Sequence, residues 1–123
     1  MTAPFAFADD LGPEKLVEIT DPRHGLRAFL AVDNTAAGPA IGGCRMAPDV
    51  TAAECFRLAR AMTFKNAAAG LPHGGAKSAI LADPRMAAAE KERLVRAFAR
   101  AIREETRYIP GPDMGTDETA MAW

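Results

Sequence analysis

Short apolar runs separated by turn residues occupy the first third of the chain. Residues 15–20 and 26–32 are two such runs, and the Asp-Pro-Arg-His-Gly cluster between them is of the kind that closes a strand pair. We therefore expect an antiparallel hairpin. Residues 38–46 follow with three glycines. They indicate either a strand or turn where another group approaches the backbone closely, or a glycine-rich loop with no ligand.

Two later segments have apolar residues at the spacing of an α-helix. Residues 51–69 begin with Thr51 as a candidate N-cap, and Glu54 three residues later completes a capping-box pattern. Residues 87–106 form the second helical segment. One face of it carries Leu94, Val95, Phe98 and Ile102, while its arginines lie largely elsewhere and Glu92 is spaced to pair with Arg96. This predicts an amphipathic helix on a core.

Two more strands and a last helix complete the pattern. Residues 77–84 predict a strand that starts at Lys77 and stops at a proline, and residues 107–109 predict another. Thr116 caps a final helix start that has no end signal. Strands and helices in this order predict an α/β fold, a three-layer sandwich with a mixed, partly parallel sheet flanked by helices. We expect residues 1–123 to form one domain.

Composition narrows the functional classes. The chain has 123 residues, 49% of them hydrophobic, so it can bury a core, and its net charge of −1 disfavours nucleic acid and anionic membranes as partners. No run of about 18 apolar residues is present, and we expect a soluble cytoplasmic protein. Cys44 and Cys55 are expected to be reduced and packed, and His24 and His73 lack the spacing of a metal site.

Lys77 stands out because a charged side chain follows two glycines and precedes an apolar run. A phosphate-binding loop would need glycine directly before the lysine and a helix after it, whereas Ala76 intervenes and a strand follows. The G-x-G-x-x-G fingerprint of dinucleotide sites is also missing from the sequence. Any nicotinamide chemistry would therefore need another domain.

A second interpretation groups Lys65, Lys77 and Asp113. Lys65 ends a predicted helix and the other two lie at strand ends, where loops of open α/β sheets converge on ligands. Two cations and one anion suit a small zwitterion, with one lysine fixing a carboxylate and a desolvated lysine exchanging protons. The alternatives stay open: three unrelated surface charges, and for Lys65 a solvated lysine at a helix C-terminus.

Four segments, residues 38–46, 57–71, 74–85 and 107–116, resemble in order and spacing the N-terminal domain of the glutamate/leucine/phenylalanine/valine dehydrogenases. The similarity runs from about residue 15 to residue 123 and is greatest to the leucine dehydrogenase branch. It implies oxidative deamination of an amino acid to its 2-oxo acid. It also implies a homo-oligomer, and a second domain, absent from this chain, that binds NAD or NADP.

The resemblance also implies roles for individual residues. Lys65 would bind the substrate carboxylate with the backbone of Gly42 and Gly43, and Met62 would line the pocket. Lys77 would activate the water that attacks the imino acid, beside two glycines, Gly74 and Gly75, that let substrate and backbone approach. Asp113 would carry protons to and from the substrate nitrogen.

Position 41 bears on the substrate. Glutamate-specific members of the family carry a lysine there to meet the side-chain carboxylate, whereas this chain has Ile41. An unpaired carboxylate in a closed pocket is costly, so we expect a branched or aromatic apolar substrate. The alternatives are a glutamate-specific dehydrogenase and a stand-alone ligand-binding or assembly module without hydride transfer.

Overall fold

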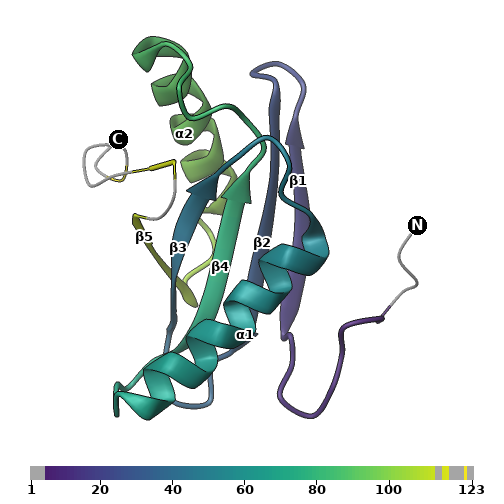
Figure 1. Cartoon of the computed structure of the whole chain (residues 1–123), viewed down its shortest axis with the longest axis vertical. Helices are drawn as coiled ribbons and strands as arrows, with labels where there is room; N and C mark the ends of the chain where they lie inside the picture. The colour runs from purple at the N-terminus through teal and green to yellow at the C-terminus, as the bar shows by residue number, and fades with distance from the viewer. Residues whose placement is uncertain (1–4, 113–114, 117–120, 122–123) are drawn as a thin grey trace.

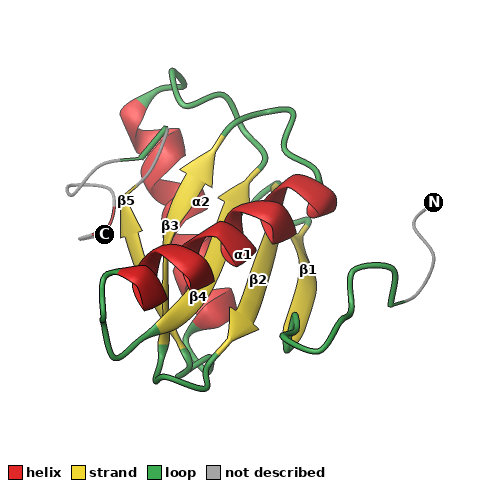
Figure 2. Cartoon of the chain, turned by 60° about the horizontal axis from the view of Figure 1, so that its bottom comes forward, coloured by secondary structure: helices red, strands yellow, loops and turns green. Residues whose placement is uncertain are grey.

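In the part of the chain that the structure describes, a five-stranded sheet carries one helix on each face (Figures 1 and 2). The computed structural model describes residues 5–112, 115, 116 and 121. The elements in chain order are β1 (Lys15–Asp21), β2 (Leu26–Asn34), β3 (Ala40–Met46), α1 (Ala52–Ala68), β4 (Gly74–Ile80), α2 (Ala88–Ile102) and β5 (Tyr108–Pro112). In Figure 1, α1 crosses the front of the sheet and α2 lies behind it. The predicted three-layer α/β sandwich is confirmed.

The strand order is β1-β2-β4-β3-β5. β1 and β2 form the expected antiparallel hairpin, and Gly25 in their turn has a φ of 69°, which glycine adopts without steric cost. β2 also pairs antiparallel with β4, whereas β3 runs parallel to both β4 and β5. Each parallel step follows a crossover through a helix, which produces the predicted mixed sheet.

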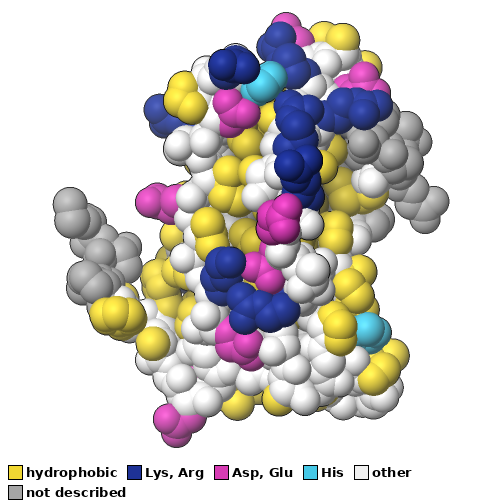
Figure 3. Space-filling model, turned by 180° about the vertical axis from the view of Figure 1, so that it is seen from behind, with side chains coloured by type: hydrophobic (Ala, Val, Ile, Leu, Met, Phe, Trp, Pro, Cys, Tyr) yellow, Lys and Arg dark blue, Asp and Glu magenta, His cyan; other side chains and the backbone are white. Residues whose placement is uncertain are grey.

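The sheet face under α2, called the α2 face below, holds the main apolar core. Leu94, Val95 and Phe98 are buried there, as the periodicity predicted, and pack with Met46 and Ile80. The outer side of α2 is charged: Glu92 and Arg96 pair at 3.4 Å, and Lys and Arg side chains gather over this part of the molecule in Figure 3. The exposed arginines of this helix segment are Arg93, Arg96, Arg100 and Arg103.

The opposite face, called the α1 face, is packed differently. The hydroxyl of Thr51 caps α1 by accepting a hydrogen bond from the Glu54 N–H at 3.1 Å, as predicted. The helix buries only Cys55, Ala59 and Asn66 against the sheet. These side chains are small or polar, so α1 lies close to the strands beneath it.

The glycine pair before Lys77 serves this close packing. A side-chain carbon on Gly75 would lie 2.1 Å from the backbone nitrogen of Thr63 in α1, and one on Gly74 would lie 1.5 Å from the backbone oxygen of Asn34. Both glycines therefore make room for the protein's own backbone. This confirms the close backbone approach that was expected of the pair, and the expected approach of the substrate stays a prediction.

The strand containing Lys77 begins earlier than predicted. β4 starts at Gly74, and Lys77 is the fourth of its seven buried residues, not the first residue of a strand beside a loop. Two glycines weaken a strand signal, but here helix and neighbouring strand enclose them. The predicted last helix falls largely outside the described residues, although Thr116 Oγ1 donates to the Cys44 carbonyl at 2.7 Å.

Both cysteines are buried and free, as expected. Burial raises the pKa of Cys44, and it raises the pKa of Cys55 to about 12, so neither thiol ionises near neutral pH. Among the described residues, no helix is both long enough and apolar enough to span a bilayer.

Candidate functional site

The α1 face of β3 and β4 carries the predicted catalytic lysine. Strand alternation and the parallel register, in which Ile41 pairs with Gly75 and Arg45 with Ala79, place Lys77 on this face between those pairs. α1 packs mainly on β2 and β4 and runs beside β3 (Figures 1 and 2). Lys77 therefore lies at the border between the part of the sheet that α1 covers and the strands next to it.

Lys77 is a buried cation, with only 7% of its surface exposed. Its burial lowers its pKa, and the positive charge of Arg45 on β3 lowers it further, with a smaller effect from Lys65. Its backbone oxygen accepts a hydrogen bond from the Cys55 thiol at 3.4 Å, which ties the strand to α1. Desolvation and like-charge repulsion favour the neutral amine, the form that accepts a proton.

Lys65 and Met62 lie on the side of α1 that faces β3. Arg60 and Thr63 mark the opposite side, because both bond to Asp33 on β2. Glu54 marks the β3 side through its ion pair with Arg45, and Lys65 follows it by three helical turns. Glu54 and Lys65 therefore point to the same side of α1, and Glu54 points there because it pairs with Arg45 on β3. Lys65 is exposed in the last turn of α1 and Met62 is half-buried.

The backbone at Gly42 and Gly43 is held from behind by a buried hydroxyl pair that sequence reasoning missed. Tyr108 donates to the carbonyl of Gly42 at 3.0 Å, and its oxygen lies 2.8 Å from Ser78 Oγ. Because Tyr108 has one proton to donate, Ser78 is the donor in the second bond. Burial raises the pKa of Tyr108 far above neutrality, so this chain of hydrogen bonds persists at physiological pH.

Ile41 occupies the neighbouring position on the α1 face of β3, half-buried between its register partners Gly75 and Ile109. The structure thus brings Ile41, Gly43 and Lys77 onto one stretch of sheet, with Met62 and Lys65 on the adjoining side of α1. Asp113 lies outside the described residues, and its predicted role stays a prediction.

A polar cluster between α1 and β2 was also missed. The wholly buried carboxylate of Asp33 accepts bonds from Arg60 Nε at 2.8 Å and Thr63 Oγ1 at 2.6 Å. Arg60 also bonds Asp9 at 2.8 Å, which holds the pKa of that exposed carboxyl at about 2. The cluster fixes the N-terminal segment and the angle of α1. No local spacing signals it, because its members come from three distant segments.

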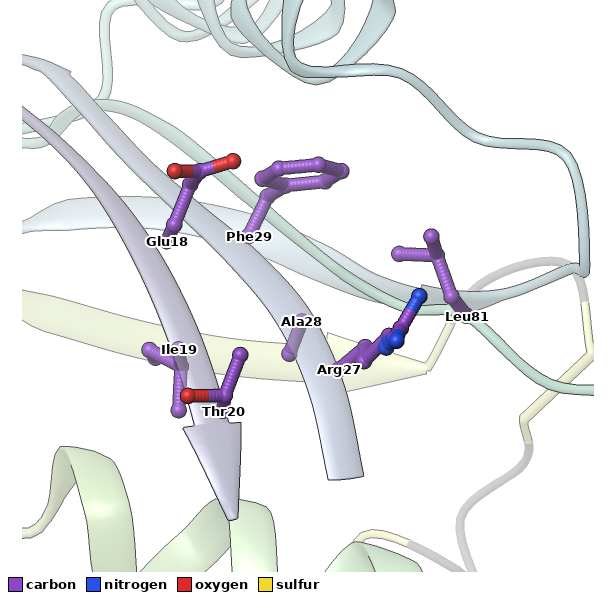
Figure 4. A pocket seen from close by; sticks show the side chains of 7 residues that line it. All are labelled: Glu18, Ile19, Thr20, Arg27, Ala28, Phe29 and Leu81. Carbon is purple, nitrogen blue, oxygen red and sulfur yellow. The ribbon is translucent and has the colours of Figure 1, made fainter. Parts of the chain in front are cut away.

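A hollow of about 300 Å³ lies over the other edge of the sheet (Figure 4). Its lining comes from β1, β2 and Leu81, with Glu18 and Phe29 side by side as register partners. None of the predicted site residues contributes to it.

The chain is similar to known proteins in both sequence and fold. The family described as Glu/Leu/Phe/Val dehydrogenase, dimerisation domain, matches residues 13–123. An NADP(+)-dependent glutamate dehydrogenase of Pyrobaculum calidifontis is 50% identical over 122 residues, covering 90% of this chain and 29% of the relative. A leucine dehydrogenase of Bacillus subtilis is 42% identical over 117 residues, covering 91% of this chain and 32% of the relative.

Among solved structures, the hetero-hexameric glutamate dehydrogenase of Thermus thermophilus in a Leu-bound form superposes with a TM-score of 0.82 at 36% identity. The match covers 90% of this chain and 29% of that one. The chain thus spans about a third of the length of the relatives it matches. It belongs to the glutamate/leucine/phenylalanine/valine dehydrogenase family and corresponds to that family's dimerisation domain.

Proposed function

We propose that residues 1–123 are the substrate-binding and oligomerisation domain of an NAD(P)-dependent amino acid dehydrogenase, which assembles as a homo-oligomer. The observation that carries the proposal is Lys77, a desolvated lysine in mid-strand whose pKa is lowered. Burying a charged group is costly, and perturbed pKa values cluster at functional sites. Family membership supplies the reaction class, oxidative deamination of an amino acid to its 2-oxo acid.

The proposed roles follow from position. Lys65 and the backbone of Gly42 and Gly43 would hold the substrate carboxylate, with Met62 against the substrate side chain. Neutral Lys77 would take a proton from the water that attacks the imino carbon, and the amine nitrogen would then leave as ammonia. Asp113 would pass protons to and from that nitrogen.

The cofactor is proposed to be NAD or NADP, held mainly by a separate domain, because this sequence has no glycine-rich dinucleotide turn. When bound, it would accept the hydride from the substrate α-carbon. This chain's residues would bind and orient the amino acid and move protons, and those are the roles that their chemistry fits.

The proposed substrate is an apolar L-amino acid, because Ile41 presents a half-buried hydrocarbon on the α1 face of β3. A carboxylate brought against Ile41 would lose hydration without gaining a partner. Glutamate is the second candidate, since a relative named as a glutamate dehydrogenase is 50% identical to this chain.

The test is to assay the natural gene product for reduction of NAD and NADP with leucine, valine, phenylalanine and glutamate. Turnover with an apolar amino acid supports the proposal. Preference for glutamate would keep the reaction and overturn the interpretation of Ile41. No turnover with any of the four would favour a binding module.

Substituting position 41 sharpens the test. Ile41→Lys should shift preference toward glutamate, whereas Leu16→Lys, a matched change on the exposed edge strand β1, should leave the substrate profile unchanged. An unaltered profile in Ile41→Lys would remove this residue from the substrate side-chain pocket.

A further inference from the structure

Arg45 lies next to Lys77 on the same face of the sheet. β3 and β4 are parallel, and Arg45 pairs with Ala79, two residues beyond Lys77. The two cations are therefore diagonal neighbours on adjacent strands, a separation that long side chains bridge. The Arg45 side chain is mostly buried, with 17% of its surface exposed, so solvent screens its charge weakly.

Glu54 holds the guanidinium in place. Its carboxylate lies 3.3 Å from Arg45 Nη1. Glu54 is in turn fixed at the start of α1, where its N–H donates to Thr51, and the first turn of a helix favours a carboxylate. The N-cap of α1 thus fixes the residue that orients Arg45.

Arg45 has the largest charge effect on Lys77 among the residues that the structure describes. The described elements packed around this lysine carry the following titratable or charged groups: Arg45 and Cys44 on β3, Glu54, Cys55 and Lys65 on α1, and Asp33 on β2. Asp33 is already bonded to Arg60, and both thiols are neutral because burial raises their pKa. Lys65 is exposed and is the weaker of the two cations. Among the described residues, Arg45, with Glu54 beside it, is therefore the strongest charge acting on Lys77.

We propose that Arg45, anchored by Glu54, is a positioning cation that keeps Lys77 in its neutral, proton-accepting form. The inference rests on the proposed function and adds two residues to it, neither of which needs to touch the substrate. An arginine suits this role because its guanidinium stays charged at every pH at which an enzyme works. A lysine in its place could itself lose a proton.

The pH dependence of kcat/KM in the natural gene product tests the proposal. Activity rises with pH as Lys77 loses its proton, so the midpoint of the acidic limb follows Lys77. Arg45→Gln removes repulsion and should move the limb to higher pH. Glu54→Gln removes the charge that offsets Arg45 and should move the limb to lower pH. Arg45→Lys, which keeps the charge, should leave the limb close to its original position.

The Glu92–Arg96 pair on the outer side of α2 is the matched control, because its separation of 3.4 Å is similar and it lies on the other face of the sheet. Glu92→Gln and Arg96→Gln should leave the limb unmoved. A purely structural salt bridge between β3 and α1 would cost stability in both Arg45→Gln and Glu54→Gln without shifting the limb in opposite directions.

Two failures are distinguishable. If Lys77→Ala retains normal turnover, the proposed function of Lys77 is wrong. If Lys77→Ala is inactive but the limb does not move in Arg45→Gln or Glu54→Gln, only the role of Arg45 is overturned. If Arg45→Gln does not fold, Glu54→Gln alone tests the proposal. A midpoint of the acidic limb that moves to lower pH in Glu54→Gln supports it, and a midpoint that stays in place or moves to higher pH contradicts it.

Discussion

The two faces of the sheet are built on different principles. The α2 face is mainly apolar and joins Leu94, Val95 and Phe98 to Met46 and Ile80, and it also buries the Ser78–Tyr108 hydroxyl pair. The α1 face buries the charged side chains Lys77 and Asp33 together with Asn66, which donates to the Gly74 carbonyl at 2.7 Å. Hydrophobic burial stabilises the first face, whereas the second is stable only because its buried polar groups have partners.

The apolar packing on the α2 face supplies most of the stability, whereas the proposed chemistry lies on the α1 face. A face that already buries charged groups can hold the proposed base, Lys77, in a desolvated site, at an energetic cost that the opposite face offsets. Substitutions on the α2 face should therefore change stability most. Substitutions at Lys77 and Arg45 should change activity and its pH dependence.

The largest stability loss is expected from Phe98→Ala. Removing a buried ring from the α2 core leaves a cavity and should lower the free energy of unfolding by about 3–5 kcal/mol. Urea denaturation of the chain measures the loss. The control, Arg100→Ala on the exposed side of the same helix, should change stability by less than about 0.5 kcal/mol. Equal effects would mean that α2 does not pack as described.

Asp33→Asn should have the next largest effect, about 2–3 kcal/mol. The substitution keeps the shape of the side chain but removes the negative charge to which Arg60 and Thr63 donate hydrogen bonds. The guanidinium keeps its ion pair with Asp9 and its contact with the Phe56 ring. Denaturation curves beside those of Asp49→Asn, an exposed site, provide the comparison. No loss beyond the control would show that polar pairing does not hold the α1 face together.

Tyr108→Phe is expected to cost about 1–2 kcal/mol, because it leaves the Gly42 carbonyl and the Ser78 hydroxyl without their buried partner. In the natural gene product it should also raise KM for the amino acid, since the Gly42 backbone is proposed to hold the substrate carboxylate. A double-mutant cycle with Ser78→Ala should be non-additive. Additive effects would break the proposed hydrogen-bond chain.

The smallest expected effect is the contribution of Glu105 to the pH dependence of the unfolding free energy. Hydrogen bonds from Lys15 and then Arg107 hold the pKa of Glu105 at about 2, below its ordinary value of 4.5. Because the folded-state pKa is depressed, the stabilisation is present above about pH 4.5 and is lost as the pH falls toward 2. Both partners are partly exposed, so the contribution is about 1 kcal/mol.

Glu105→Gln isolates that contribution. Its unfolding free energy should fall less steeply than that of the wild type between pH 4.5 and 2. Urea denaturation at several pH values measures the slope, and parallel slopes for the two proteins would rule out Glu105 as the titrating group.

Local patterns predicted most of the elements. The hairpin, the capped helix at Thr51 and the buried face of α2 follow from spacing and composition, because each depends on neighbours in sequence. β4 was misplaced at its start since Gly74 and Gly75 carry no strand signal of their own. Both positions need glycine because the backbones of α1 and β2 occupy the space that a side chain would fill, and the sequence alone does not show that these elements lie there.

The same limit applies to the site. Lys77 was identifiable because a lysine within an apolar run is locally anomalous. Arg45, Ser78 and Tyr108 were not identified, because their contacts join residues from 9 to 66 positions apart. Only the register of β3 against β4 and β5 brings them together.

The central claim is that buried Lys77 is the base, and one comparison tests it most directly. Turnover of the natural gene product with its preferred amino acid should be measured for Lys77→Ala and for Lys91→Ala, a lysine on α2 outside the proposed site. The account predicts that Lys77→Ala folds and loses about 10²–10⁴-fold in kcat, while Lys91→Ala keeps its activity. A folded Lys77→Ala variant with normal kcat would contradict it.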